Sequence, residues 1–170
     1  MSRPSSPKDT ILFFGVLFNS DYKIDKFLSI SKQKYGNYFY KEINYFPMAQ
    51  YYSSEMGEQD KLSRAFMIFT TPYKREELIE TKLWANELEL KFSKNNNRLI
   101  NIDPGYISLE NCILSTCKSY SHRVYLGDGV YSELVYQYIN SQMEPLDWTY
   151  PDYLEDEVKN LFKWSRNLIL

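Results

Sequence analysis

The run from Ile11 to Phe18, ILFFGVLF, constrains the fold most, because so apolar a stretch must be removed from water. It is rich in residues that favour β-structure and it ends at the polar Asn19-Ser20, which is typical of a buried strand. Arg3 and Lys8 precede it in the manner of a signal peptide, but no small-residue cleavage site follows. We therefore expect this run to be the first strand of the core.

The segments that follow alternate between helical and strand-like patterns. We expect a helix from a cap at Ser20 or Asp21 to Gly36, strands at 38–46 and 65–70, a helix at 74–93 and a strand at 98–102. This order predicts an α+β fold, the ferredoxin-like βαββαβ sandwich, with helices on one face of an antiparallel sheet. A flavodoxin-like α/β fold with a parallel sheet is the alternative, although the second and third strands have no predicted helix between them.

Turn signals mark the expected boundaries of these segments. Pro72 should end its strand, and Asp103-Pro104-Gly105 should form a turn after the strand at 98–102. The polar connection containing Glu55-Met56-Gly57 is interpreted as a turn, and Lys94–Asn97 should end the second helix.

The second half of the chain adds a hairpin and a terminal helix to this core. Residues 110–117 are compatible with either a short helix or a strand. Residues 122–126 and 130–140 flank Gly127-Asp128-Gly129, which predicts a hairpin with a three-residue turn. From Leu154 onward the apolar residues recur at helical spacing, which predicts an amphipathic helix that packs back on the domain.

Length and composition limit the class of protein. A chain of 170 residues fits one domain, so we expect a flexible tail at 1–9 and a single domain at 10–170. The two cysteines, Cys112 and Cys117, form neither a disulfide framework nor a zinc site, and they suit a reduced, cytoplasmic protein. No apolar stretch approaches the roughly 20 residues of a membrane span. We therefore expect a soluble protein with no membrane attachment.

Polar side chains able to do chemistry gather between Asn101 and Tyr153, around the only histidine of the chain. A carboxylate at the end of a core strand, a histidine and a second carboxylate suit acid–base chemistry, and nearby cations suit a phosphate or carboxylate ligand. The predicted catalytic residues are Asp103, His122 and Glu133, and the predicted ligand-binding residues are Lys118, Arg123, Tyr106, Trp148, Tyr150 and Asp152.

These residues also have structural explanations. Asp103 before Pro-Gly is an ordinary turn residue, and many of the 16 tyrosines must serve packing. Strand alternation places His122 and Arg123 on opposite faces, and it points Glu133 away from the apolar side of its strand. If Asp103 and Glu133 converge, the metal they would suit is Mg²⁺, whereas a single histidine disfavours zinc or iron.

Several odd motifs of this chain occur together in one known family. They are Glu55-Met-Gly57, NIDPGY at 101–106, Lys118, His122-Arg123, GVYSE at 129–133 and WTYPDY at 148–153. On these motifs the chain resembles domain-of-unknown-function family 4416 over nearly its whole length. It departs from the family at Thr116-Cys117, where paired threonines precede the lysine, so Cys117 is not a predicted site residue. The resemblance implies a cytosolic prokaryotic protein and no particular activity.

We expect a small-molecule site for a phosphorylated or nucleotide-like ligand, which in enzyme terms would be a hydrolase or transferase using Mg²⁺. Whether the chain is an enzyme stays open. The alternative is a non-catalytic interaction module that binds protein or RNA through exposed aromatic residues. The sequence has no G-x-x-x-x-G-K-[ST] or G-x-G-x-x-G motif, which excludes phosphate-loop and dinucleotide sites. Its net charge of -2 leaves no general nucleic-acid footprint.

Overall fold

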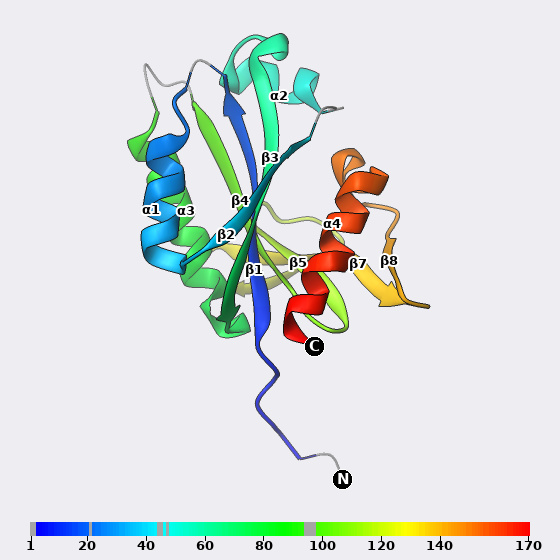
Figure 1. The fold of residues 1–170 in the computed structure, drawn as a ribbon. Helices are drawn as coiled ribbons and strands as arrows, with labels where there is room; N and C mark the ends of the chain where they lie inside the picture. Colours follow the sequence, from blue (N-terminus) through cyan, green and yellow to red (C-terminus); the bar gives the residue numbers. More distant parts are fainter. Residues whose placement is uncertain (1–2, 21, 44–45, 47, 94–97) are drawn as a thin grey trace.

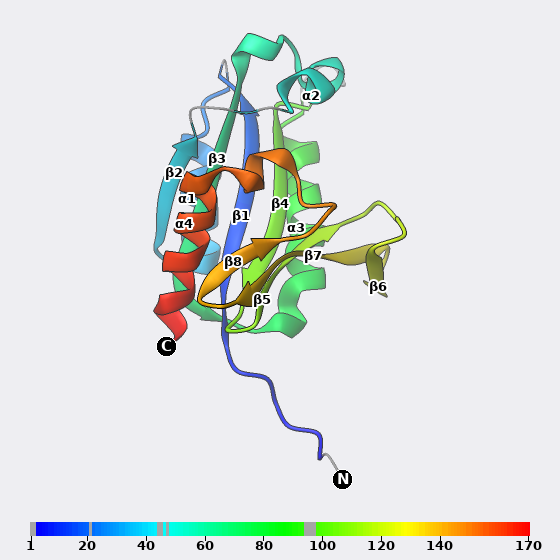
Figure 2. The ribbon, with the colours of Figure 1, turned by 90° about the vertical axis from the view of Figure 1, so that its right-hand side faces the viewer.

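The computed structural model describes residues 3–20, 22–43, 46, 48–93 and 98–170, which form an α+β fold on one curled antiparallel sheet (Figure 1, Figure 2). The strand order is β2-β3-β1-β4-β5-β7-β6, and β8 pairs with β7. The strands are β1 (Thr10–Asn19), β2 (Tyr38–Ile43), β3 (Leu62–Tyr73), β4 (Ile100–Ile107), β5 (Asn111–Thr116), β6 (Arg123–Gly127), β7 (Val130–Ile139) and β8 (Gln142–Pro145). The α-helices are α1 (Asp25–Tyr35), α2 (Ala49–Met56), α3 (Leu78–Lys91) and α4 (Asp156–Arg166). Short 3₁₀ turns are η1 (Gln59–Lys61), η2 (Arg75–Glu77), η3 (Pro151–Leu154) and η4 (Asn167–Ile169).

Strand β1 lies in the middle of the sheet because both of its faces are apolar. All its residues are buried, and it pairs antiparallel with β3 on one side and with β4 on the other. This confirms the predicted core strand at 11–18. The flavodoxin-like alternative is wrong, because the strand pairs of the described residues are antiparallel.

Helices cover both faces of the sheet rather than one. Helices α1 and α3 lie on one side and α4 lies on the other (Figure 1). Phe14 of β1 belongs to the buried cluster that includes Phe27 of α1. The neighbouring Phe13 belongs to a second cluster with Val158 and Phe162 of α4. Because successive side chains of a strand point to opposite faces, a strand as apolar as β1 needs a helical layer on each side. The terminal helix packs back on the domain, as predicted.

Two of the expected strand ends are wrong, because proline stays inside the strand in both cases. β3 continues through Pro72 to Tyr73, and β4 continues through Asp103-Pro104-Gly105 to Ile107. The carbonyl of Pro104 accepts a hydrogen bond of 2.6 Å from Ser115, so this residue faces β5. The N–H that proline lacks would also point toward β5. Because β4 and β5 pair only from Gly105 onward, no strand at Pro104 needs that N–H, and the sheet loses no hydrogen bond.

The connection between β2 and β3 contains helix α2, which the sequence did not predict. Met56, in the segment interpreted as a turn, is the last residue of this helix and is buried, and Gly57 ends it with a φ of 102°. Helix α1 begins at Asp25 without a side-chain cap. The expected cap at Asp21 and the expected helix end at 94–97 lie outside the described residues. Helix α3 ends at Lys91.

The hairpin prediction is confirmed, with a shorter turn than expected. Gly127 pairs directly with Val130, which leaves only Asp128 and Gly129 in the loop. Their φ angles are 50° and 76°, the left-handed pair that a two-residue hairpin turn requires. Residues 110–117, which the sequence left open, contain strand β5.

Strands β4 and β5 separate soon after their connecting turn. They pair only where Gly105–Ile107 meets Cys112–Leu114, after which β5 continues as a partner of β7. In Figure 2 the strands from β5 onward turn away from the plane of β1 and β4. The edge of β4 before Gly105 is thereby left without a neighbouring strand. The candidate site forms beside it.

Candidate functional site

A cavity of about 150 Å³ lies between α3, β4, the end of β5 and the segment 150–153. Its lining is rich in charge. The cations are Arg64, Lys82, Arg98 and Lys118, the carboxylates are Glu89, Asp103 and Asp152, and the aromatic residues are Phe46, Tyr52, Tyr150 and Tyr153. Asn86, Asn101 and Cys117 also line it. We call this cavity the central pocket.

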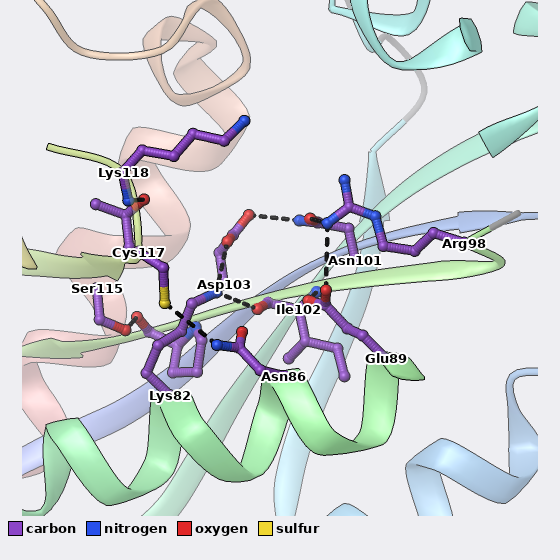
Figure 3. Close-up of polar contacts among 12 residues, drawn as sticks. Lys82, Asn86, Glu89, Arg98, Asn101, Ile102, Asp103, Ser115, Cys117 and Lys118 are labelled. Carbon is purple, nitrogen blue, oxygen red and sulfur yellow. Dashed lines mark hydrogen bonds and ion pairs between the residues drawn. The ribbon is translucent and has the colours of Figure 1, made fainter. Parts of the chain in front are cut away.

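Two charged residues of α3 occupy the place of the missing strand beside β4 (Figure 3). Glu89 accepts a hydrogen bond of 2.6 Å from the N–H of Ile102, and Lys82 donates one of 3.0 Å to the carbonyl of the same residue. Both side chains are buried, whereas the apolar Leu83 and Leu90 of the same helix are exposed. A buried backbone group without a partner is costly, so this face of α3 is polar where β4 lacks a neighbour.

Asp103 is the central acceptor of the pocket. Its Oδ1 lies 3.2 Å from Lys82 Nζ, and its Oδ2 accepts a hydrogen bond of 2.6 Å from Asn101. Burial alone would raise its pKa, but the charges of Lys82 and Arg64 and the two hydrogen bonds bring the pKa below its ordinary value. Asp103 is therefore an ionised carboxylate at neutral pH. It sits on a strand and not in a turn.

Arg98 closes the end of the pocket nearest the start of β4. Its Nη1 donates to Glu89 Oε2 at 3.2 Å and to Asn101 Oδ1 at 2.9 Å. Burial raises the pKa of Glu89, and Asp103 raises it further, against the lowering effects of Lys82, the Ile102 amide and Arg98. The charges on this side of the pocket thus form one continuous network from α3 to β4 (Figure 3).

A buried ion pair forms another wall. Arg64 Nε donates to Asp152 Oδ2 at 2.8 Å, and their side chains are only 7% and 3% exposed. Burial would lower the pKa of Arg64, but Asp152 and the other acidic groups around it raise it, so the cation persists. A Cβ on Gly15 would lie 2.9 Å from Arg64 Nη2 and 2.9 Å from the Tyr153 hydroxyl. The absence of a side chain on Gly15 gives the guanidinium its space on the sheet.

Lys118 differs from the other cations of the pocket. Lys82, Arg64 and Arg98 each have a carboxylate partner, whereas among the described residues no carboxylate lies within ion-pair distance of Lys118 Nζ. Lys118 is exposed, and its backbone is held by Arg123, whose Nη1 donates to its carbonyl at 3.0 Å.

A second group of polar residues, the hairpin cluster, lies beside the pocket. His122 Nε2 and Arg123 Nε lie 3.4 Å and 2.6 Å from the same oxygen, Oε2 of Glu133. The expectation that His122 and Arg123 lie on opposite faces is wrong, because β6 begins only at Arg123 and His122 belongs to the preceding turn. Trp148 stacks on His122 with ring centroids 4.9 Å apart.

Glu133 is buried, contrary to the expectation that it points away from the apolar side. Only 1% of the residue is exposed. Strand β7 has an irregularity opposite Cys112 and Ile113, so that Val135 and Tyr136 both enter one buried cluster. Strict alternation, on which the expectation rested, does not continue across this point.

The structure thus places the predicted site residues in two groups, with Tyr106 apart from both. Asp103, Lys118, Tyr150 and Asp152 line the central pocket, and His122, Arg123, Glu133 and Trp148 form the hairpin cluster. The groups are linked by a hydrogen bond of 2.9 Å from Arg123 Nη2 to the Tyr150 hydroxyl. Tyr106 belongs to neither group and packs under Arg75, whose charge lies 5.7 Å from its ring centroid.

Sequence reasoning missed Arg64, Lys82, Glu89, Arg98 and Asn101. One signal for the α3 residues was present. Lys82, Asn86 and Glu89 are spaced four and then three residues apart, which places them on one face of a helix. Arg64 sits at the start of an apolar strand and carried no comparable signal.

Asp103 and Glu133, which would suit Mg²⁺ if they converged, have different hydrogen-bond partners. In the described ranges, no three His, Cys, Asp or Glu side chains are grouped to hold a metal ion. Likewise, none of the described helices has the length and apolar character needed to cross a membrane.

Comparison with known proteins identifies the family but no activity. No curated protein and no solved structure matches the chain. The family described as "Domain of unknown function (DUF4416)" matches residues 8–168. This match extends from the residues before β1 to the last turn of the chain, so it includes every residue of the central pocket and of the hairpin cluster. The chain therefore belongs to the domain-of-unknown-function family DUF4416.

Proposed function

We propose that the central pocket binds a small phosphorylated ligand. The observation that carries this proposal is Lys118, a cation at the pocket without a carboxylate partner among the described residues. The four cations and three carboxylates of the lining leave one excess positive charge. A phosphate group supplies the complementary charge and several acceptor oxygens, and lysine is a common partner for it.

The ionised state of Asp103 favours binding over acid–base catalysis by this carboxylate. A general base works best when its pKa lies near the working pH, and the pKa of Asp103 is lowered instead. Glu133 and His122 contact each other and Arg123 in the hairpin cluster, and neither lines the pocket. We therefore assign Asp103 as an acceptor for the ligand and for Lys82, and we assign His122 and Glu133 to the support of Arg123.

Calorimetric titration with inorganic phosphate and with propyl phosphate tests this proposal. The Lys118→Ala variant should bind both roughly fivefold more weakly, since one ionic contact near a surface is worth about 1 kcal/mol. The matched control is Lys91→Ala, because Lys91 is exposed and does not line the pocket. Equal binding by the two variants, or no binding by the wild-type protein, would contradict the proposal.

One observation favours the alternative function, an interaction module. Strand β6 lies at the edge of the sheet, and Val124, Tyr125 and Leu126 on it are 65%, 59% and 39% exposed. An exposed apolar edge strand is a template for an added strand from another chain. Substitution of Val124 and Tyr125 with Lys should abolish any concentration-dependent self-association or peptide binding, while phosphate binding stays unchanged.

We also infer the fold relationship and the cellular location of the protein. The order β2-β3-β1-β4, with α1 and α3 on one face, supports a ferredoxin-like unit extended by β5 to β8 and α4. The two free cysteines, one of them exposed, support a reducing cytoplasm. A prokaryotic source is the remaining part of this proposal and rests on the resemblance of the motifs.

A further inference from the structure

We propose that the part of the ligand beyond its phosphate carries hydroxyl groups, as in the phosphate ester of a polyol or sugar, and that Asp103 recognises them. This inference rests on the proposed binding of a phosphorylated ligand in the central pocket. It assigns the two ends of the ligand to different residues: the phosphate to Lys118, and the hydroxyl groups to Asp103.

The first argument is the unused acceptor capacity of Asp103. Its side chain is 23% exposed, and each of its oxygens receives one hydrogen bond, from Lys82 and from Asn101. An ionised carboxylate accepts about four hydrogen bonds, so each oxygen of Asp103 can take one more. These remaining positions lie at the lining of the pocket.

The second argument is the sign of the charge. Asp103 is ionised, and a phosphate placed directly against it would be repelled. The favourable position for the phosphate is at Lys118, which follows the end of β5, whereas Asp103 lies within β4. A ligand that also reaches Asp103 must present a hydrogen-bond donor there, because a carboxylate covered by an apolar group loses its water without compensation.

The third argument is the character of the remaining walls. Tyr52 and Tyr150 both line the pocket, and both are only partly exposed. Aromatic rings can pack against the apolar faces of a sugar-like ring, and the neighbouring carboxylate and amide groups can form hydrogen bonds with its hydroxyl groups. Asp152, which receives Arg64 on one oxygen, adds a second carboxylate to the same lining.

The test compares glycerol 1-phosphate with propyl phosphate, which have the same carbon chain and the same phosphate but differ in hydroxyl groups. Titration calorimetry on the wild-type protein should show roughly tenfold tighter binding of glycerol 1-phosphate, the value of one hydrogen bond to a charged group. In Asp103→Asn this preference should disappear. Binding of propyl phosphate to the variant should be equal to wild type or tighter, because the repulsion is removed.

The outcomes separate the two proposals. If propyl phosphate and inorganic phosphate both fail to bind the wild-type protein, the proposed function is wrong. If they bind and glycerol 1-phosphate binds no tighter, the proposed function stands and the hydroxyl inference is wrong. A preference that survives in a folded Asp103→Asn protein would overturn the assignment to Asp103. Should that variant not fold, the wild-type comparison alone decides whether hydroxyl groups are recognised, and Asp103→Ser replaces it.

Discussion

Arg123 donates a hydrogen bond of 2.6 Å from Nε to Oε2 of the buried Glu133, and the same guanidinium holds two residues of the central pocket. Its Nη1 binds the carbonyl of Lys118 at 3.0 Å, and its Nη2 binds the hydroxyl of Tyr150 at 2.9 Å. Arg123 itself does not line the pocket. It is a positioning residue, because the fork of its donors sets the place of a cation and of an aromatic wall.

Replacement of Arg123 with Ala should lower the free energy of unfolding by about 3 kcal/mol, because Glu133 keeps its buried charge and loses its closest partner. Urea denaturation measures this loss. The control is Arg75→Ala, whose ion pair with Glu110 is largely solvated on the carboxylate side and should cost less than about 1 kcal/mol. The double variant with Glu133→Gln should recover part of the stability. Similar losses in Arg123→Ala and Arg75→Ala would show that the buried pair does not have this role.

Gly15→Ala should destabilise the wall of the pocket formed by Arg64. The added Cβ would lie 2.9 Å from Arg64 Nη2, and Arg64 has little freedom to move because Asp152 holds it in a buried pair. We expect a loss of about 1–3 kcal/mol in thermal unfolding and weaker binding of phosphate. Gly129→Asn is the control, since no atom lies within 4 Å of a Cβ there and Asn tolerates the φ of 76°. If Gly15→Ala is as stable as this control, Arg64 is not confined as described.

The sequence predicted the elements of the fold better than their ends. Continuous apolar runs and the Gly127–Gly129 turn depend on local chemistry, and the strands and the hairpin they predicted are present. Pro72 and Pro104 were misinterpreted because proline breaks a strand only if its N–H is needed, and that depends on the neighbouring strand. The departure of β5 from β4 cannot be seen in either strand alone. It depends on the pairing of β5 with β7, which is a property of the whole sheet.

The same limit applies to the site. Asp103, Lys118, Tyr150 and Asp152 were found because unusual polar residues were concentrated in one stretch of sequence. Arg64 lies 88 positions from Asp152 in the chain, and no local pattern signals that they pair. The polar face of α3 exists because one edge of β4 needs hydrogen-bond partners. Such a requirement belongs to the tertiary structure.

Tyr22 should make the stability of the protein sensitive to alkaline pH. Burial raises the pKa of Tyr22 from 10.0 to about 12, so the folded state holds the phenol proton more tightly than the unfolded state. Its contribution to stability is complete below pH 10 and is lost as the pH rises through about 12. Within the described part of the chain its hydroxyl has no hydrogen-bond partner.

Tyr22→Phe should therefore retain its stability at neutral pH and lose about 1 kcal/mol less than the wild-type protein between neutral and strongly alkaline pH. Urea denaturation at a series of pH values measures this difference. Identical pH profiles for the two proteins would exclude a contribution from Tyr22.

Lys82→Met should disturb both the fold and the acid–base behaviour of the pocket. The variant leaves Asp103 without its cation and the carbonyl of Ile102 without a donor, so we expect a loss of about 3 kcal/mol in urea denaturation. Lys91→Met on the same helix is the control, because Lys91 is 68% exposed and its replacement should change stability by less than about 0.5 kcal/mol.

The acid response of Lys82→Met distinguishes an electrostatic role of Lys82 from simple packing. In the wild-type protein the pKa of Asp103 is lower in the folded state than its ordinary value of 3.8, so ionised Asp103 stabilises the fold. This contribution is complete above pH 3.8 and is lost as the pH falls through the pKa that Asp103 has in the folded state. Without Lys82 the folded pKa should rise toward or above 3.8, and this acid-dependent part of the stability should shrink or reverse. Titration of the Asp103 carboxyl carbon by NMR measures the change directly. An unchanged Asp103 pKa in a destabilised variant would mean that Lys82 acts through its contact with the backbone of β4 and not through its charge.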